Sequence, residues 1–571
     1  MLTPLPPFLL ESHMSLAADA LTIRGALSCA LLAATLPVHV LHATQRSAVP
    51  TTVVRQDSTV TARLKAERNE DPNVAPARKE GEGPFARLII RGVNLIDGYG
   101  SAPRGPVDVV VEGNKVVEIA GVGYPHVKID ETKRPKGATR ELDANGMYMM
   151  PGLVDLHVHQ GTQQKAPDSE YYNKLWLANG ITTVRGVPFA SFDYSVKERD
   201  RSARNEITAP RYFVYQRPGT GWGRGVPRTP EAAREWVRWA KANGADGLKL
   251  GAERADIMAA LLDEAKKLGL GSTAHLQQGG VGQMNADMAT RLGLESVTHF
   301  YGIFESMYDN NQIQPWPVDA NLQDEQTRFG QVARQWSLVT PRSDKWNKFL
   351  QRLKDRDVTL DPTMTTYLTG RDVVKRMNEP WHSKYTIPSQ WAFYTPSRTN
   401  HGAYFYDWTT EDEVAWRNFY RVWMMFLNDY KNMGGRVTAS SDAGFIYNTP
   451  GFSTIEELEL LQEAGFTPGE AIRSGTLHAA ETLFKPLQRH VEFGVVEPGM
   501  LADLAIVDAN PFANLKVLYG TGWFRLNNST GKVEPYGGVK WTIKDGIVYD
   551  AKALLNDIEK MGDAQRAKIK Q

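Results

Sequence analysis

The stretch Met149-Met150-Pro151-Gly152-Leu153-Val154-Asp155-Leu156-His157-Val158-His159 decides the fold of this chain. It is a short apolar run with a proline and a glycine near its head and two histidines at its end. Such a run is typical of a buried strand in a parallel sheet. Side chains two residues apart lie on one face of a strand, so His157 and His159 point together at its carboxyl end. Two imidazoles supply half of a typical zinc-like site; two histidines in an exposed turn are the alternative.

The composition is that of a globular protein with room for one large core and a smaller domain. Of the 571 residues, 42% are hydrophobic and 23% are charged. The 66 Lys and Arg residues nearly balance the 65 Asp and Glu residues, which argues against nucleic-acid binding. Cys29 is the only cysteine. A disulfide framework and a metal site built from cysteines are therefore excluded.

Residues 1–43 resemble a secretory signal peptide, because Arg24 precedes an apolar run that ends in small residues. This run is too short for a comfortable membrane span, so we expect no stable span. We expect an exported protein, periplasmic or secreted after removal of the leader, with Met1 or Met14 as the true start. A disordered leader is the alternative. Residues 44–85 are polar, charged and rich in Pro and Gly, which indicates a flexible linker.

Short β-branched segments occur at both ends of the remaining chain. Residues 86–148 and 488–550 contain runs such as Leu88-Ile89-Ile90 and Leu504-Ala505-Ile506-Val507, separated by turn residues. Matching segments that bracket a long middle predict one small β-sandwich domain built from both chain ends. Residues 551–571 predict a terminal helix.

Strand-like and helix-like segments alternate between residues 149 and 487, as βαβ repeats require. Eight candidate strands are present, the number that closes a (β/α)8 barrel. They are Leu153–His159, Ile181–Val187, Tyr212–Tyr215, Gly247–Leu250, Ser272–His275, Ser296–His299, Val358–Thr363 and Arg436–Ser441. Helix starts are predicted at Ser453-Thr454-Ile455-Glu456 and Thr467-Pro468-Gly469-Glu470, with Gly465 ending the first helix.

Four more of these strands carry a polar residue at or near their carboxyl end: Lys249, His275, His299 and Asp442. A buried lysine costs several kcal/mol unless it is neutralised or paired. Each residue alone is more often structural, as a hydrogen-bonded core histidine or a capping aspartate is. Their order at successive strand ends, after the first histidine pair, indicates one site at the carboxyl rim of the barrel.

In combination these motifs resemble the amidohydrolase superfamily, metal-dependent hydrolases on a (β/α)8 TIM barrel flanked by a small β-sandwich. The resemblance covers most of residues 86–550, and the pattern is closest to prolidase-like and imidazolonepropionase-like members. Further motifs that carry it are Gly180-Ile181-Thr182-Thr183-Val184-Arg185, Ser441-Asp442-Ala443-Gly444, Thr476-Leu477-His478-Ala479-Ala480-Glu481 and Glu497-Pro498-Gly499-Met500-Leu501-Ala502-Asp503-Leu504.

The resemblance implies two divalent metal ions, with zinc the expected element. The implied ligands are His157 and His159 with Asp442 on one ion, His275 and His299 on the second, and Lys249, carboxylated by CO2, between the two. The resemblance also implies that a hydroxide shared by the ions attacks the substrate, while Asp442 acts as general acid and base.

Two departures distinguish the chain from the branches of the family that deaminate nucleobase-like rings. Those branches lack the lysine and place a glutamate three residues after the strand-five histidine, whereas this chain has Lys249 and Gln278. We therefore expect hydrolysis of an amide-type C–N bond in a peptide-like, N-acyl or carbamate small molecule. The alternatives are a single-metal deaminase, a lactonase-type ester hydrolase, or a ligand-retaining assembly scaffold that is not an enzyme.

Residues 301–357 and 367–433 form long insertions rich in Trp and Tyr after strands six and seven. They either roof the site or stabilise themselves through their aromatic side chains. Candidate substrate contacts are Tyr215, Arg217, Tyr301 and Tyr367. Either Arg217 or Arg185 can bind a free carboxylate on the substrate. A homo-oligomer is possible, because oligomers are common in the family that the chain resembles.

Overall fold

The computed structural model describes residues 70–309, 314–396 and 404–569. The predicted leader, residues 1–43, and the predicted linker up to residue 69 lie outside the described residues. Residues 70–85 are held against the body of the protein: the Asn73 amide donates to Pro167 O at 2.7 Å and the Glu82 amide to Val548 O at 3.0 Å. This end of the expected linker is fixed because its backbone groups pair with the domains. Within the described ranges no helix is long and apolar enough to cross a membrane.

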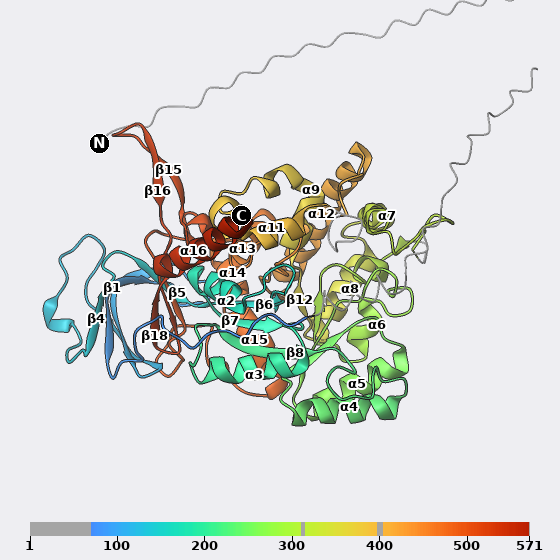
Figure 1. The fold of residues 1–571 in the computed structure, drawn as a ribbon, viewed down its shortest axis with the longest axis horizontal. Helices are drawn as coiled ribbons and strands as arrows, with labels where there is room; N and C mark the ends of the chain where they lie inside the picture. Colours follow the sequence, from blue (N-terminus) through green and yellow to red (C-terminus); the bar gives the residue numbers. More distant parts are fainter. Residues whose placement is uncertain (1–69, 310–313, 397–403, 570–571) are drawn as a thin grey trace, which may run out of the picture. The chain divides into compact units, whose positions relative to one another are not determined.

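Eight parallel strands form a curled sheet at the centre of the fold (Figure 1). They pair in chain order, and all eight candidate strands are confirmed. Almost every residue in them is buried, which is why they are apolar without alternation. The strands are β6 (Leu153–Val158), β7 (Ile181–Gly186), β8 (Arg211–Gln216), β9 (Gly247–Leu250), β10 (Gly271–Ala274), β11 (Ser296–Thr298), β12 (Thr359–Asp361) and β13 (Arg436–Val437).

The two edges of this sheet meet through single hydrogen bonds. The amide of Asp442, beyond the end of β13, donates to His157 O in β6 at 2.8 Å, and the Leu156 amide donates to Ser440 Oγ at 3.1 Å. No regular ladder joins β6 to β13 among the described residues. The sequence predicted a full barrel, and the structure shows a curled sheet whose edges are tied at the site itself.

Helices cover the outside of the curled sheet (Figure 1). In α4, Ala233, Trp236, Val237 and Ala240 are buried at helical spacing, and the side chain of Thr229 caps the first turn. The covering helices are α2 (Ser169–Ala178), α3 (Phe192–Ala203), α4 (Pro230–Ala242), α5 (Ala255–Lys267), α6 (Ala286–Arg291), α8 (Asp344–Asp355), α12 (Thr410–Asn432), α13 (Phe452–Glu463), α14 (Pro468–Ser474) and α15 (Leu477–Phe484).

One of the two predicted capping boxes forms. At α14, Thr467 Oγ1 accepts from the Glu470 amide and a Glu470 carboxylate oxygen accepts from the Thr467 amide. The prediction for α13 is wrong, because that helix begins at Phe452, before the predicted hydroxyl residue. Ser453, the predicted cap, lies in the first turn, where its Oγ donates to Thr449 O at 2.8 Å. A hydroxyl engaged by a carbonyl four residues earlier does not cap the helix.

A second sheet combines strands from both ends of the chain. Val507 of β14 lies opposite Tyr148 of β5, and this antiparallel pairing joins the C-terminal strands to the N-terminal ones. All eight strands belong to one branched sheet; the sequence predicted a sandwich. In pairing order they are β18 (Ile547–Asp550), β17 (Val539–Lys544), β14 (Leu504–Val507), β5 (Tyr148–Pro151), β1 (Leu88–Leu95), β2 (Arg104–Glu112) and β3 (Lys115–Gly121), with β4 (Arg140–Asp143) beside β1.

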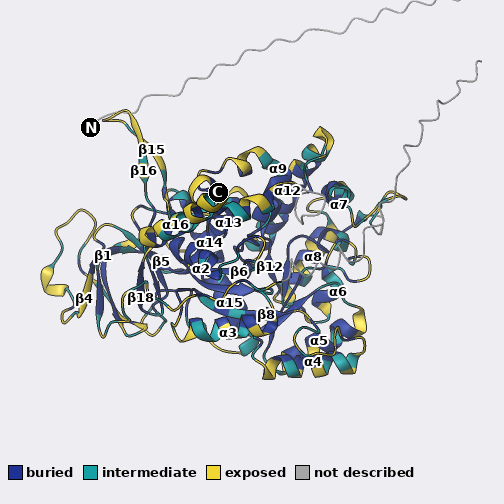
Figure 2. Cartoon of the chain, in the orientation of Figure 1, coloured by how far each residue is buried: buried dark blue, intermediate teal, exposed yellow. Residues whose placement is uncertain are grey.

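Gly152 joins β5 of this composite sheet to β6 of the curled sheet. A Cβ atom added at Gly152 would lie 2.2 Å from Thr182 Oγ1, so only glycine fits where the chain passes from one sheet to the other. The β15 (Trp523–Asn527) and β16 (Lys532–Tyr536) hairpin projects from the body and is largely exposed (Figures 1 and 2). The predicted terminal helix is α16 (Ala551–Ile569).

The two insertions are largely helical and pack through their own aromatic side chains. Tyr367 stacks on Trp416 with ring centroids 6.0 Å apart, and Trp408 also stacks on Trp416, at 5.8 Å. The insertions contribute α7 (Glu325–Val332), α9 (Met364–Met377), α10 (His382–Tyr385) and α11 (Pro388–Tyr394) besides α8 and α12. Single 3-10 turns are η1 (Glu131–Lys133), η2 (Phe304–Ser306), η4 (Ala333–Leu338), η5 (Lys485–Leu487) and η6 (Leu515–Leu518).

Candidate metal centre

The residues predicted to hold metal lie together at the carboxyl ends of the curled sheet. Three of them, His157, His299 and Asp442, offer ligand atoms that all lie within 4.8 Å of one another, and all three residues are buried. His157 is part of β6, whereas His299 directly follows β11 and Asp442 lies beyond β13. Strands far apart in the sequence therefore deliver side chains to one point, as their parallel order requires.

Asp442 is the centre of this cluster. The Nε2 atoms of His159 and His157 lie 3.3 Å and 3.6 Å from Asp442 Oδ1, and His299 Nε2 lies 3.6 Å from Oδ2. Lys249 Nζ lies 3.4 Å from His157 Nε2. The His275 ring packs edge-on against the His299 ring with centroids 4.5 Å apart. The structure thus brings all six predicted ligands into one cluster.

Backbone conformation at three strand ends aims these side chains inward. His299, Thr363 and Asp442 have φ angles of 65°, 49° and 47°, in the left-handed region that residues other than glycine rarely adopt. Such strain persists only where the surroundings hold it, and it is typical of functional sites. Thr363 Oγ1 lies 2.5 Å from His299 Nδ1, so the strained strand end after β12 also orients the histidine after β11.

Hydrogen bonds on the far side of the rings leave the Nε2 atoms available to a ligand. Pro188 O can only accept, so His159 Nδ1, 2.8 Å away, carries the proton and Nε2 keeps its lone pair. His299 is oriented by Thr363 in the same way. This division of the two ring nitrogens is the one that metal-binding histidines need.

Two buried carboxylates support the cluster, and the sequence interpretation missed both. Asp155, inside β6, accepts hydrogen bonds from Ser441 Oγ at 2.6 Å, from Thr454 Oγ1 at 2.7 Å and from the amides of His157 and Ser441 at 3.1 Å. It ties β6 to the segment that carries the central aspartate. The signal was present, because a carboxylate in the middle of a buried strand needs several donors.

The second is Asp361, at the end of β12. It pairs with Arg185 Nη2 at 3.1 Å, and its Oδ2 atom lies 3.7 Å from His157 Nδ1. Arg185 and Asp361 have no exposed surface. Arg185 is therefore engaged in a buried ion pair, which leaves Arg217 as the better of the two arginines proposed for a substrate carboxylate.

Burial disfavours the charged forms of the nitrogen groups in the cluster. It lowers the pKa of His157 and His299 well below their usual value, and the positive charge of Lys249 acts in the same direction. Burial also lowers the pKa of Lys249 to about 7, against the attraction of Asp442. Neutral imidazoles and a carboxylate are donors suited to a divalent cation.

Unpaired buried atoms show that the cluster suits a cation. His299 Nε2 and Asp442 Oδ1 are buried and have no hydrogen-bond partner among the described residues. Buried polar atoms of this kind cost free energy unless something binds them. Imidazole nitrogens and a carboxylate oxygen converging within 4.8 Å form a donor set that fits a divalent metal ion.

Two of the four predicted substrate contacts form an aromatic wall beside the cluster. Tyr301 stacks on the His275 ring at 4.8 Å, and Tyr367 lies 5.4 Å from His299. The Tyr367 hydroxyl donates to the Tyr301 hydroxyl at 3.2 Å. Both side chains are buried, so this wall is rigid.

The other two predicted contacts lie in different surroundings. Arg217 is exposed just beyond β8, yet its positive charge still contributes to the lowered pKa of Lys249. Tyr215 is buried, and its ring packs against Gly247 and Gly271, the first residues of β9 and β10. Tyr215 thus lies toward the opposite end of those strands from the cluster, and its role as a substrate contact stays a prediction.

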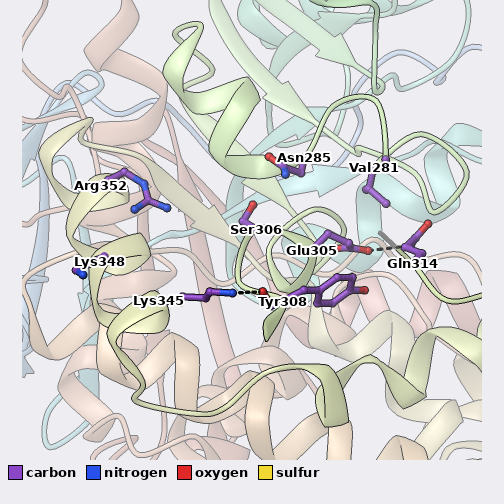
Figure 3. Close-up of a pocket in the computed structure, with 10 residues that line it drawn as sticks. Val281, Asn285, Glu305, Ser306, Tyr308, Gln314, Lys345, Lys348 and Arg352 are labelled. Carbon is purple, nitrogen blue, oxygen red and sulfur yellow. Dashed lines mark hydrogen bonds between the residues drawn. The ribbon is translucent and has the colours of Figure 1, made fainter. Parts of the chain in front are cut away.

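A separate pocket of about 380 Å³ lies among the loops that follow β10 and β11 (Figure 3). None of the six predicted ligands lines it. Some of its polar groups are already engaged, since Lys345 Nζ donates to Tyr308 O at 2.6 Å and Gln314 Nε2 donates to Glu305 at 3.0 Å. The pocket is therefore not part of the metal centre.

Comparisons with known proteins agree with this geometry. No family model matches the chain. A dihydroorotase from Anaeromyxobacter dehalogenans is 29% identical over 230 residues, 37% of this chain and 47% of that protein. An adenine deaminase from Methanoculleus marisnigri is 48% identical over 50 residues, 9% of each chain. The chain spans less than half the length of these curated relatives.

A solved structure of an Xaa-Pro dipeptidase with bound methionine covers 81% of this chain and all of its own, with a TM-score of 0.53 and 17% identity. That likeness establishes the fold. The fold, the residues at the strand ends and the partial sequence matches all agree with the resemblance to the amidohydrolase superfamily.

Proposed function

We propose that the chain is a metal-dependent hydrolase that breaks an amide-type C–N bond in a small molecule. The convergence of three imidazole Nε2 atoms on Asp442, with Lys249 beside His157, is the observation that carries this proposal. The names of the similar proteins, a dihydroorotase, an adenine deaminase and an Xaa-Pro dipeptidase, support a C–N bond as the one that is broken. The proposed substrate is a peptide-like, N-acyl or carbamate compound, whose apolar group would pack against the aromatic wall of Tyr301 and Tyr367.

Two divalent ions, expected to be zinc, would complete the centre. When bound, they would supply Lewis-acid polarisation of the substrate carbonyl and of the attacking water. Lys249 would join them as a carbamate: its neutral amine adds to CO2, the N–C bond forms and one proton leaves to solvent. Burial of Lys249 favours this step because it disfavours the ammonium form. The proposed ligands are His157, His159 and Asp442 for one ion, His275 and His299 for the other, and carboxylated Lys249 for both.

Asp442 is placed to move the proton that hydrolysis requires. Its carboxylate takes the proton of the attacking water as the water oxygen bonds to the substrate carbon, and then gives that proton to the leaving nitrogen. Its backbone is fixed by the bond from its amide to His157 O, and Asp155 holds the preceding residue, Ser441. Tyr301 and Tyr367 would limit access of other water.

Metal analysis of the full chain tests the proposal. After incubation with zinc and bicarbonate, the wild type should bind about two equivalents of zinc, and Lys249→Ala about one or none. Lys197→Ala makes the same change at an exposed lysine and should keep the wild-type content. Equal content near one equivalent in the wild type and Lys249→Ala would leave Lys249 structural and favour a deaminase. No bound metal in either protein would rule the mechanism out.

Substrate screening should then use dipeptides and N-acyl amino acids beside adenine and simple lactones. Release of amine from the first group alone supports the amide hydrolase, whereas ammonia from adenine or acid from a lactone supports one of the alternatives. We also propose export, because residues 1–43 resemble a signal peptide. Cell fractionation with N-terminal sequencing tests that proposal.

A further inference from the structure

Lys165 is a buried cation that the proposed mechanism does not use. It lies in the loop between β6 and α2, and only 3% of it is exposed. Its one side-chain hydrogen bond among the described residues runs to Gly444 O at a long 3.4 Å. Among the described residues, no carboxylate oxygen lies within 4.0 Å of the Lys165 Nζ atom. A buried ammonium without a counterion is strongly unfavourable.

The surroundings of Lys165 provide an apolar cage and little hydrogen bonding. Its Nζ atom lies 4.1 Å from the centre of the Phe445 ring and 5.5 Å from that of Phe393. The Gly444 carbonyl already accepts a second bond, from Gln390 Nε2 at 3.1 Å. Aromatic faces attract a cation but accept no strong hydrogen bond from it, so the ammonium retains donors for a ligand.

Lys165 is also close to the metal centre. Gly444 follows Asp442 by two residues, and the Phe445 ring packs edge-on against His159 with centroids 6.1 Å apart. Burial is the main cause of the lowered pKa of His159, and the charge on Lys165 is near enough to add to it. Burial lowers the pKa of Lys165 itself to about 8, against the attraction of Asp442. This cation is on the β6 and β13 side of the site, whereas Arg217 follows β8.

We propose that Lys165 binds an anionic group of the substrate, so that the substrate is an amide carrying a carboxylate or similar oxyanion beside an apolar side chain. An oxyanion would accept the unused N–H groups and neutralise the charge. Phe393 and Phe445 would pack against the apolar side chain. The loop is held in place by Ser389 in α11, whose hydroxyl donates to Lys165 O at 2.9 Å. This assignment rests on the proposed function for the identity of the site.

Binding of probes without a C–N bond tests the assignment independently of turnover. The probes are 3-phenylpropanoate, 3-phenylpropane-1-sulfonate and 3-phenylpropan-1-ol. A second set carries a butyl chain in place of the phenyl-bearing chain. Each probe is titrated calorimetrically into the zinc-loaded protein. The sulfonate keeps the negative charge but is a poor metal ligand, which separates binding by Lys165 from binding by zinc. The wild type should bind both anions at least about tenfold more tightly than the alcohol.

Three variants decide the outcome. Lys165→Met keeps the aliphatic stem against the two phenylalanine rings. This variant should bind the sulfonate and the alcohol about equally tightly, whereas Lys165→Arg should retain most of the preference for the sulfonate. Arg217→Met removes the competing cation at the rim and should leave the preference within about twofold of the wild type. Should Lys165→Met not fold, Lys165→Gln replaces it.

The assignment is overturned if the preference survives in Lys165→Met, if it is lost in Arg217→Met instead, or if the wild type shows none. Zinc content of each variant must equal that of the wild type. Loss of the preference in Lys165→Met without any amide hydrolysis by the wild type would support the anion site and refute the proposed function. Amide hydrolysis by the wild type, with an unchanged preference for the sulfonate in Lys165→Met, would support the proposed function and refute the anion site.

Discussion

Asp155 shows how one buried residue organises the metal centre from outside it. Its two carboxylate oxygens accept four hydrogen bonds that join β6, Ser441 and Thr454. Asp155→Leu should lower the free energy of unfolding by about 3–5 kcal/mol, because buried donors lose their acceptor in a shared network. Asp155→Asn keeps an acceptor for the amides and should cost less than about 2 kcal/mol. Denaturant unfolding of the metal-free proteins measures both.

Equal losses for the two variants would contradict this account, because the hydrogen bonds would then be unimportant and only packing would matter. Zinc content gives a second measurement. Asp155→Leu should reduce it, since the segment carrying Asp442 loses its anchor, whereas Asp155→Asn should keep it near the wild-type value.

His382 should make the stability of the protein sensitive to acid. It is buried in α10, with Nδ1 2.8 Å from Thr386 Oγ1 and Nε2 2.8 Å from Arg376 O. Burial lowers its pKa from 6.5 to about 4. Between these values the unfolded chain binds the proton and the folded protein does not, so stability present above pH 6.5 is lost as the pH falls toward 4. The loss attributable to His382 is about 3 kcal/mol.

Unfolding free energies measured from pH 7 to pH 4 test the acid sensitivity. His382→Gln should show a shallower decline than the wild type, whatever its stability at pH 7. His490→Gln replaces an exposed histidine and should decline in parallel with the wild type. If the wild type and His382→Gln decline in parallel, another group is responsible.

Individual site residues could be predicted from the sequence only where they close a strand. His157, His275 and His299 each sit at the end of a recognisable apolar run, and strand order then brings them together. Lys165 lies in a loop without any periodic pattern, so its burial and its closeness to Asp442 follow only from the three-dimensional fold.

At the scale of single elements, the capping box at the start of α14 should be measurable in stability. The Thr467 side chain accepts a hydrogen bond from the Glu470 amide there, and the Glu470 side chain accepts one from the Thr467 amide. Thr467→Ala should lower the free energy of unfolding by about 1 kcal/mol, whereas Thr467→Ser keeps the hydroxyl and should change it by less than about 0.5 kcal/mol. Urea denaturation distinguishes the two variants. Equal stability of Thr467→Ala and Thr467→Ser would mean that the box contributes nothing.

Elements could be predicted from the sequence where local and tertiary preferences agree. The eight parallel strands are apolar runs of ordinary length, and Gly465, with a φ of 106°, ends α13 as expected. The start of α13 could not be found, because the helix begins directly after Gly451, which has a φ of 81°, and the predicted cap Ser453 donates to Thr449 O inside the first turn. The sandwich prediction is not confirmed, because the strands pair in one branched sheet. Strand composition reveals β structure, but only pairing shows that β1 contacts β2, β4 and β5 in one sheet.

On the scale of the whole molecule, the curled sheet and the composite sheet are joined at several points. β5 runs through Gly152 into β6, and Arg211 in the curled sheet pairs with Asp503 beside β14 at 3.1 Å. Thr542 Oγ1 in β17 donates to Leu177 O in α2 at 2.6 Å. Neither sheet can lose its structure without exposing buried groups of the other. We therefore expect the described part of the chain to unfold as one cooperative unit.

Scanning calorimetry with and without a chelator tests this cooperativity together with the metal centre. Metal that binds only the folded protein stabilises it by about 4 kcal/mol when free metal is a thousandfold above its dissociation constant. Chelation should therefore move the whole endotherm of the wild type down by a few degrees. Lys249→Ala should show a smaller shift, because the bridging ligand is missing. Two endotherms, of which only one responds to the chelator, would mean that the composite sheet unfolds independently and that Gly152 is a hinge between separate units.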